Sequence, residues 1–121
     1  MSAAAWIAVG LLGGIAAAAR FVLDAEVTVW RPGRFPLGIL VVNLLGALAL
    51  GVVAGAGLHG EAYTIVAGGV IGSFTTFSTW ILDSHRLAVA GAERLMALNI
   101  GISLVAGFAA VALGHWLGSL L

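Results

Sequence analysis

The sequence predicts an all-α integral membrane protein with four transmembrane helices, and three observations support this. Of its 121 residues, 62% are apolar and only 8% are charged. Soluble domains carry about 25% charged residues, so a soluble globule of this composition would lack the polar surface to dissolve. The charged residues fall almost entirely between four long apolar runs. These runs are unbroken rather than alternating, which argues against a membrane barrel.

Each of the four runs is long enough to cross a bilayer, which takes about 20 apolar residues. The first extends from about residue 3 to residue 20 and ends at Arg20. We interpret it as a true span and not a signal peptide, because no basic stretch precedes it and three similar runs follow. The others are expected at 37–58, 62–82 and 95–118, so residues 1–121 form one four-helix transmembrane domain.

Several function classes are excluded or disfavoured by composition. The chain has no Cys, which excludes disulfides, thiolate metal sites and a Cys nucleophile. Its formal net charge is zero and it has no basic run, which argues against nucleic-acid binding. No nucleophile–base pair or metal-ligand cluster stands out, so we do not expect an enzyme.

The arginines are distributed with a strong bias. Four spans place both termini and the 59–61 turn on one side of the membrane, and the two longer connections on the other. All five cationic side chains lie on that second side: Arg20, Arg31, Arg34, Arg86 and Arg94. The positive-inside rule therefore predicts that this side faces the cytoplasm, with both termini outside.

Polar residues within the spans are concentrated in the same half of the membrane. At about 1.5 Å of rise per residue, Asn43 is expected roughly 9 Å deep, and Asn99 and Ser103 roughly 6 and 12 Å deep. Ser78 and Thr79 fall at a similar level. One subunit then holds half of a polar path, which a second, antiparallel copy would complete. The alternative is that the hydroxyls bond their own helix carbonyls and the two asparagines tie helices together.

Glycine pairs spaced four residues apart predict close helix packing. The second, third and fourth spans each contain one such pair: Gly51 and Gly55, Gly68 and Gly72, and Gly114 and Gly118.

The most informative segment covers residues 68–80, in the third span. Gly72 is at its middle, and three glycines within five residues predict a break near the bilayer midplane. A break would free backbone carbonyls, which can bind a cation where protein surrounds them. Phe74, Phe77 and Trp80 follow along one face, and aromatic ring edges carry the positive partial charge that suits an anion.

Four patterns along the chain resemble those of one family of small bacterial membrane proteins. Gly72-Ser73-Phe74-Thr75-Thr76-Phe77-Ser78-Thr79-Trp80 is similar to a TTFSTF-like core that follows glycine, and Val42-Asn43-Leu44-Leu45-Gly46 is similar to a VNLLG pattern. Gly13-Gly14 before Arg20-Phe21, and the spacing of Asn99, Ser103 and Gly107, match the first and fourth helices. On these residues the sequence resembles the fluoride channels of the Fluc or CrcB family.

The resemblance implies a dual-topology dimer in the inner membrane that passively exports cytoplasmic fluoride and so relieves its toxicity. It also implies a structural Na⁺ at the dimer centre, held by the backbone carbonyls of Gly72 and Thr75. Arg20 would attract anions to the vestibule. The implied pore residues are Asn43, Phe77, Trp80 and Asn99, with Ser78, Thr79 and Ser103 on a polar track.

Two positions depart from the family pattern, and the charge bias leaves the assembly open. Trp80 replaces the second phenylalanine and adds an indole N–H, and Asn99 stands where tyrosine is common. A non-conducting or partner subunit is therefore an alternative. The arginine bias predicts a single orientation and hence pairing with an oppositely oriented paralogue, whereas a homodimer requires both orientations. A small multidrug antiporter is disfavoured because the first span contains no carboxylate.

Overall fold

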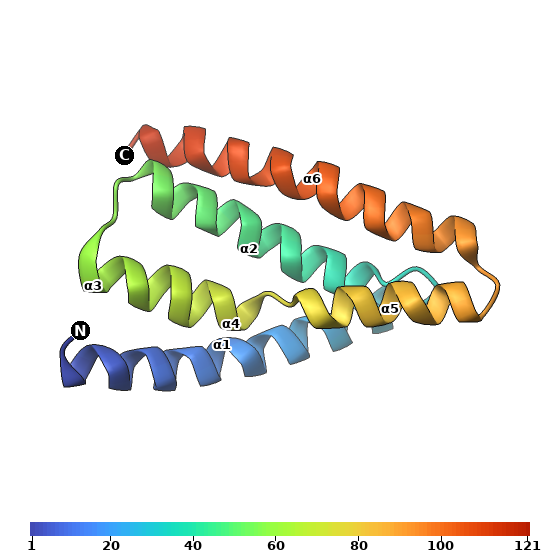
Figure 1. Ribbon diagram of the computed structural model, residues 1–121, viewed down its shortest axis with the longest axis horizontal. Helices are drawn as coiled ribbons and strands as arrows, with labels where there is room; N and C mark the ends of the chain where they lie inside the picture. Colours follow the sequence, from blue (N-terminus) through green and yellow to red (C-terminus); the bar gives the residue numbers. More distant parts are fainter.

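The computed structural model describes all 121 residues, and every regular element in it is helical. The elements are α1 (Ala3–Trp30), α2 (Leu37–Gly55), α3 (Gly60–Tyr63), the π-helix η1 (Thr64–Ile71), α4 (Gly72–Phe74), α5 (Phe77–Val89) and α6 (Glu93–Ser119). The run from α3 to α5 is one span with a break in it, so the chain has four helices long and apolar enough to cross a membrane. Both termini lie at the same end of the bundle (Figure 1). These observations confirm the predicted fold class.

The first helix is longer than predicted and does not end at Arg20. It continues ten residues further, to Trp30, and Arg20 lies within it. Hydropathy does not predict the end of this helix, because a charged residue can end an apolar run without ending the helix that contains it. The helix ends only where Pro32 follows, since the residue before a proline is pushed out of helical conformation. Arg31, in that position, has φ −132° and ψ 69°.

Glycine determines where the second and third spans end. Gly57 has φ +75° and Gly91 has φ +77°, the left-handed conformation that commonly follows a helix. Beyond each glycine, an N–H bonds back five residues along the chain: Leu58 N to the Val53 carbonyl, and Ala92 N to the Leu87 carbonyl. The second span therefore ends at Gly55 instead of residue 58, and the third continues to Val89 instead of residue 82.

The third span is broken, as predicted, but the break lies after the glycines. Thr75 and Thr76 have extended backbone, with ψ 161° and 123°. The glycine-rich stretch instead forms η1, in which the Gly72 N–H bonds the Ala67 carbonyl five residues back. Such wide turns are rare and often occur at functional sites.

Two of the three glycine pairs pack α2 directly against α6. A Cβ on Gly51 would overlap the Val111 carbonyl, and one on Gly114 would overlap the Leu48 carbonyl. Gly55 and Gly118 are equally close to backbone atoms of the facing helix. The pair at residues 68 and 72 makes no such contact: a Cβ on Gly68 would meet nothing within 4 Å. Gly69 and Gly13 provide the close approach of η1 to α1 instead.

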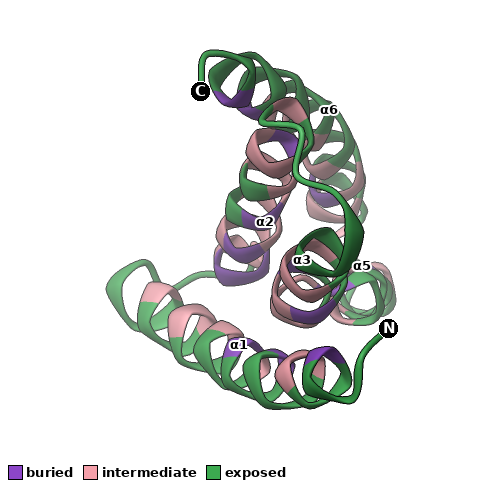
Figure 2. Cartoon of the chain, turned by 90° about the vertical axis from the view of Figure 1, so that its left-hand side faces the viewer, coloured by how far each residue is buried: buried purple, intermediate pink, exposed green.

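Little of the single chain is buried. Only 16 of 121 residues are buried, and they lie along the surfaces where helices face each other (Figure 2). The outer faces carry large exposed apolar side chains, among them Phe77, Val105 and Phe108 at 72%, 74% and 76% exposure. Apolar surface of this extent is what lipid or another subunit would cover.

Candidate functional site

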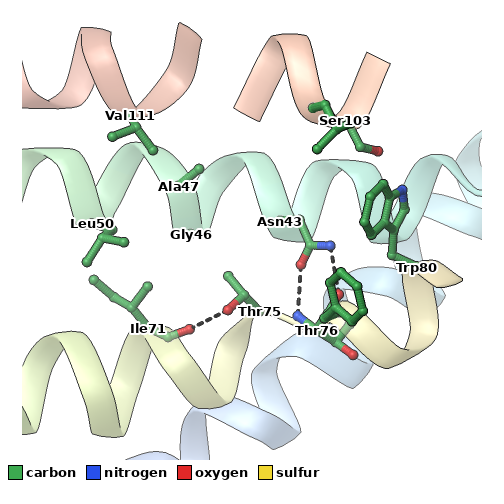
Figure 3. Close-up of a pocket in the computed structure, with 12 residues that line it drawn as sticks. Asn43, Gly46, Ala47, Leu50, Ile71, Thr75, Thr76, Trp80, Ser103 and Val111 are labelled. Carbon is green, nitrogen blue, oxygen red and sulfur yellow. Dashed lines mark hydrogen bonds between the residues drawn. The ribbon is translucent and has the colours of Figure 1, made fainter. Parts of the chain in front are cut away.

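A groove of about 320 Å³ runs along the face where α2, α5 and α6 meet the break in the third span. It brings together four residues predicted to line a path: Asn43, Phe77, Trp80 and Ser103 (Figure 3). The remaining lining residues are Gly46, Ala47, Leu50, Ile71, Thr75, Thr76, Leu104 and Val111. The groove thus combines a few polar groups with apolar and aromatic walls, and none of its lining side chains is titratable.

Asn43 fastens α2 to the break. Its Nδ2 donates to the Thr76 carbonyl at 2.9 Å, and its Oδ1 accepts from the Thr76 N–H at 2.9 Å (Figure 3). An extended residue has lost its helical partners, and this one amide satisfies both of its backbone groups. A primary amide has two N–H donors, so Asn43 retains one for the groove.

Phe77 and Trp80 form the aromatic wall of the groove. Their ring centroids are 5.4 Å apart and their planes are inclined at 69°, an edge-to-face pair. The Phe77 side chain is 72% exposed, so it projects from the chain toward whatever covers the groove. The indole N–H of Trp80 is not free, because it donates to the backbone carbonyl of Asn99 at 3.2 Å.

The hydroxyls at the start of α5 form a cluster beside the groove. Thr76 caps the helix by accepting from the Thr79 N–H at 3.2 Å. Its Oγ1 also lies 3.3 Å from Ser78 Oγ and 3.1 Å from Thr79 Oγ1. Ser78 and Thr79 therefore lie next to a lining residue without lining the groove themselves.

Asn99 is not in the groove. It is 1% exposed, between α5 and α6, and its Nδ2 donates to Ser84 Oγ at 2.9 Å. This position matches the alternative in which the asparagine ties two helices together.

Two backbone carbonyls near the break lack the donors that they would have in an unbroken helix. In an unbroken helix the Gly72 carbonyl would accept the Thr76 N–H, which here donates to Asn43 instead. The Thr75 carbonyl would accept the Thr79 N–H, which here donates to the Thr76 hydroxyl. The Thr75 carbonyl is approached by Arg20 Nη1 at 3.4 Å, a long hydrogen bond. Arg20 thus contacts the break from α1 and is not among the groove residues.

Two residues of this region were not predicted from sequence. Thr76 lines the groove, caps α5 and bonds Asn43, and threonine is among the residues preferred at a helix N-cap. Ser84 bonds both Asn99 and Trp80, but it follows the apolar run, where hydropathy gives no reason to select it.

Comparison with known proteins gives a consistent result. Residues 7–115 match the family model described as "CrcB-like protein, Camphor Resistance (CrcB)". The chain is 41% identical over 123 residues to "Fluoride-specific ion channel FluC 2" of Mycobacterium tuberculosis H37Rv, covering 99% of this chain and 95% of the relative. It is 47% identical over 108 residues to FluC 2 of Symbiobacterium thermophilum, covering 85% and 88%. FluC 1 of the same organism is 37% identical over 120 residues, covering 93% and 96%.

Proposed function

We propose that this chain, which belongs to the CrcB family of membrane proteins, is a passive fluoride-selective ion channel that exports fluoride across the bacterial inner membrane. The observation that carries the proposal is the groove in which an asparagine amide, a serine hydroxyl and two aromatic rings meet beside a helix break. The fluoride-specific names of relatives that match nearly the whole chain support it. Those names describe ion channels, and we infer no enzymatic activity.

The chemistry of the groove suits a small, strongly hydrated anion. Fluoride loses water only where donors replace it, and the remaining N–H of Asn43 and the hydroxyl of Ser103 are such donors. The positive ring edges of Phe77 and Trp80 add weak attraction. Weak sites in series let an ion leave again, whereas a full positive charge in the path would hold it. The lining has no titratable group to couple the movement to protons, which favours passive flow.

The assembly that we propose is an antiparallel dimer. The groove is open along one side, and its exposed Phe77 needs a second surface to enclose a path. A second four-helix subunit, related by an axis in the membrane plane, would also continue the polar groups into the other half of the bilayer.

At the centre of this dimer we propose a structural Na⁺. The residues fit the ion because carbonyl oxygens of unwound backbone bind Na⁺ in other membrane proteins, and the Gly72 and Thr75 carbonyls have lost their usual helical donors. Two carbonyls from each subunit would hold the ion. Its positive charge would lower the cost of a nearby anion. Replacing Na⁺ with N-methylglucamine should therefore lower the resistance of the purified dimer to denaturant.

We further propose that the partner is an oppositely oriented paralogue. Arg31, Arg34 and Arg94 lie in or next to the connections at one end of the bundle and predict a fixed orientation. Symbiobacterium thermophilum has relatives named FluC 1 and FluC 2, so two such chains do occur in one organism. In that arrangement this chain is either a conducting or a silent subunit. Equal amounts of both orientations in a thiol-accessibility map would instead support a homodimer.

Fluoride efflux from liposomes tests the function. The chain is reconstituted alone and with a co-expressed paralogue, and efflux is followed with a fluoride electrode, using chloride as the control ion. Fast fluoride-selective efflux in either preparation is the expected result. Absence of fluoride efflux from both, with protein shown to be folded and inserted, would overturn the proposal.

A further inference from the structure

Trp80, Ser84 and Asn99 form a closed ring of hydrogen bonds between α5 and α6. The Trp80 indole N–H donates to the backbone carbonyl of Asn99 at 3.2 Å, and the Asn99 side chain donates through Nδ2 to Ser84 Oγ at 2.9 Å. Ser84 Oγ donates in turn to the Trp80 carbonyl at 2.9 Å. Each residue donates once and accepts once. The ring is well shielded from solvent, since Asn99 is 1% and Ser84 is 4% exposed.

This ring fixes the direction in which the indole points. Figure 3 shows the nitrogen of Trp80 on the edge of the indole farther from Asn43, while the ring itself lines the groove. The bond to Asn99 uses the only donor that an indole has. Asn99 also lies one turn before Ser103 on α6, so the bond attaches the aromatic wall to the helix that supplies the groove hydroxyl.

We propose that Ser84 and Asn99 are positioning residues for Trp80, holding its indole N–H inside the protein so that the groove meets an aromatic wall without an added donor. The proposal rests on the function proposed above. The sequence departs from its family's pattern at Trp80 and Asn99, and the two residues are linked twice. The indole N–H bonds the backbone carbonyl of Asn99, and the Asn99 side chain is tied back to Trp80 through Ser84. The larger aromatic ring is thus accommodated by a neighbour that keeps its polar edge away from the ion. A free indole N–H in the path would add one more donor to the groove and so deepen one of the weak sites from which the ion must leave.

The test uses the full-length chain with Trp80 as the sole tryptophan, obtained by replacing Trp6, Trp30 and Trp116 with phenylalanine. Ser84→Ala removes the side-chain bond that ties Asn99 on α6 to α5, so the backbone carbonyl of Asn99 is held less firmly against the indole N–H. The acrylamide quenching constant of Trp80 should therefore rise and its emission shift to the red. The matched control is Ser119→Ala. Like Ser84→Ala, it removes a hydroxyl that donates to a carbonyl of its own helix. The bond lost is the one from Ser119 Oγ to the Trp116 carbonyl at 2.6 Å, and neither residue lines the groove. The control should leave the quenching unchanged.

Fluoride flux shows whether Ser84 acts by positioning the Trp80 indole or through a general effect on the structure. In the wild-type background Ser84→Ala should lower flux about tenfold, the factor that corresponds to one buried hydrogen bond. In the Trp80→Phe background no indole remains to be positioned, so Ser84→Ala should change flux by less than about twofold. Ser119→Ala should leave the flux unchanged in both backgrounds.

Unchanged quenching of Trp80 in the Ser84→Ala variant would overturn the proposal. An equal loss of flux in the two backgrounds would do so as well, because it would show that Ser84 acts independently of the indole. If the wild-type chain conducts no fluoride alone or with a paralogue, the proposed function fails. The quenching comparison still decides in that case whether Ser84 positions Trp80.

Discussion

Replacing Asn43 with alanine should damage both stability and conduction, because one side chain serves the break and the groove. The variant removes two hydrogen bonds of 2.9 Å and leaves the N–H and carbonyl of Thr76 without these partners. Thr76 is 8% exposed. A buried group left unpaired costs about 1–3 kcal/mol, and water in the groove can reach part of this site. We therefore expect the free energy of unfolding to fall by about 2–4 kcal/mol.

The measurement is unfolding in mixed micelles at fixed protein and Na⁺ concentrations, since the stability of a dimer depends on both. Ser103→Ala is the matched control. It removes a polar group from the same groove but does not touch the break, so its free energy of unfolding should stay within about 0.5 kcal/mol of wild type. Fluoride flux through liposomes should fall in both variants.

An Asn43→Ala variant as stable as Ser103→Ala would refute this reasoning. It would show that the extended backbone at Thr75 and Thr76 is held by other contacts, and that Asn43 belongs to the groove alone. Unchanged flux in both variants would refute the assignment of the groove as the ion path.

Three further substitutions test separate parts of the structure. Phe77→Ile should reduce fluoride flux about tenfold while size-exclusion chromatography shows intact assembly, because isoleucine leaves an apolar side chain at this exposed position for the partner to cover. Gly114→Val should lower the free energy of unfolding by about 3 kcal/mol, whereas Gly10→Ala, with nothing within 4 Å, should not destabilise. Thr76→Ala should cost about 1 kcal/mol in the same unfolding assay through loss of the α5 cap, and Thr76→Ser should restore it.

The sequence predicts the four spans and the presence of close helix packing because both depend on local patterns. Apolar length identifies four crossings, and glycines four residues apart indicate close packing. Only the structure shows that this packing joins α2 to α6 and that Gly68 and Gly72 take no part in it. Helix ends are less predictable, because a residue such as Arg20 ends an apolar run without interrupting backbone hydrogen bonds. Pro32 and the two left-handed glycines decide the ends, and they lie outside the apolar runs or near their edges.

The exact position of the break could not be predicted from the local sequence, because it depends on a contact with another helix. Weak helix formers indicate where a helix can break, and the glycines of residues 68–72 qualify. The chain nevertheless breaks at Thr75 and Thr76, where Asn43 on another helix replaces the missing backbone partners. That contact joins residues 33 positions apart. A break inside a membrane is sustained only where such a partner exists, so its position follows from tertiary contacts more than from local propensity.

Trp80 and Asn99 are a second case in which a tertiary contact decides the effect of a residue. Taken one position at a time, each is a departure from the family's pattern and weakens the assignment of the residues around it. In the structure they are 19 positions apart, on facing helices, and the donor that tryptophan introduces bonds the backbone carbonyl of Asn99. The asparagine amide is satisfied in turn by Ser84, which bonds back to Trp80. A polar group added to a membrane interior is costly unless it is paired, so a tryptophan with this partner and a tryptophan without it are different substitutions. The groove therefore keeps an aromatic residue at position 80. The indole N–H that tryptophan adds is hydrogen-bonded at the α5–α6 interface instead.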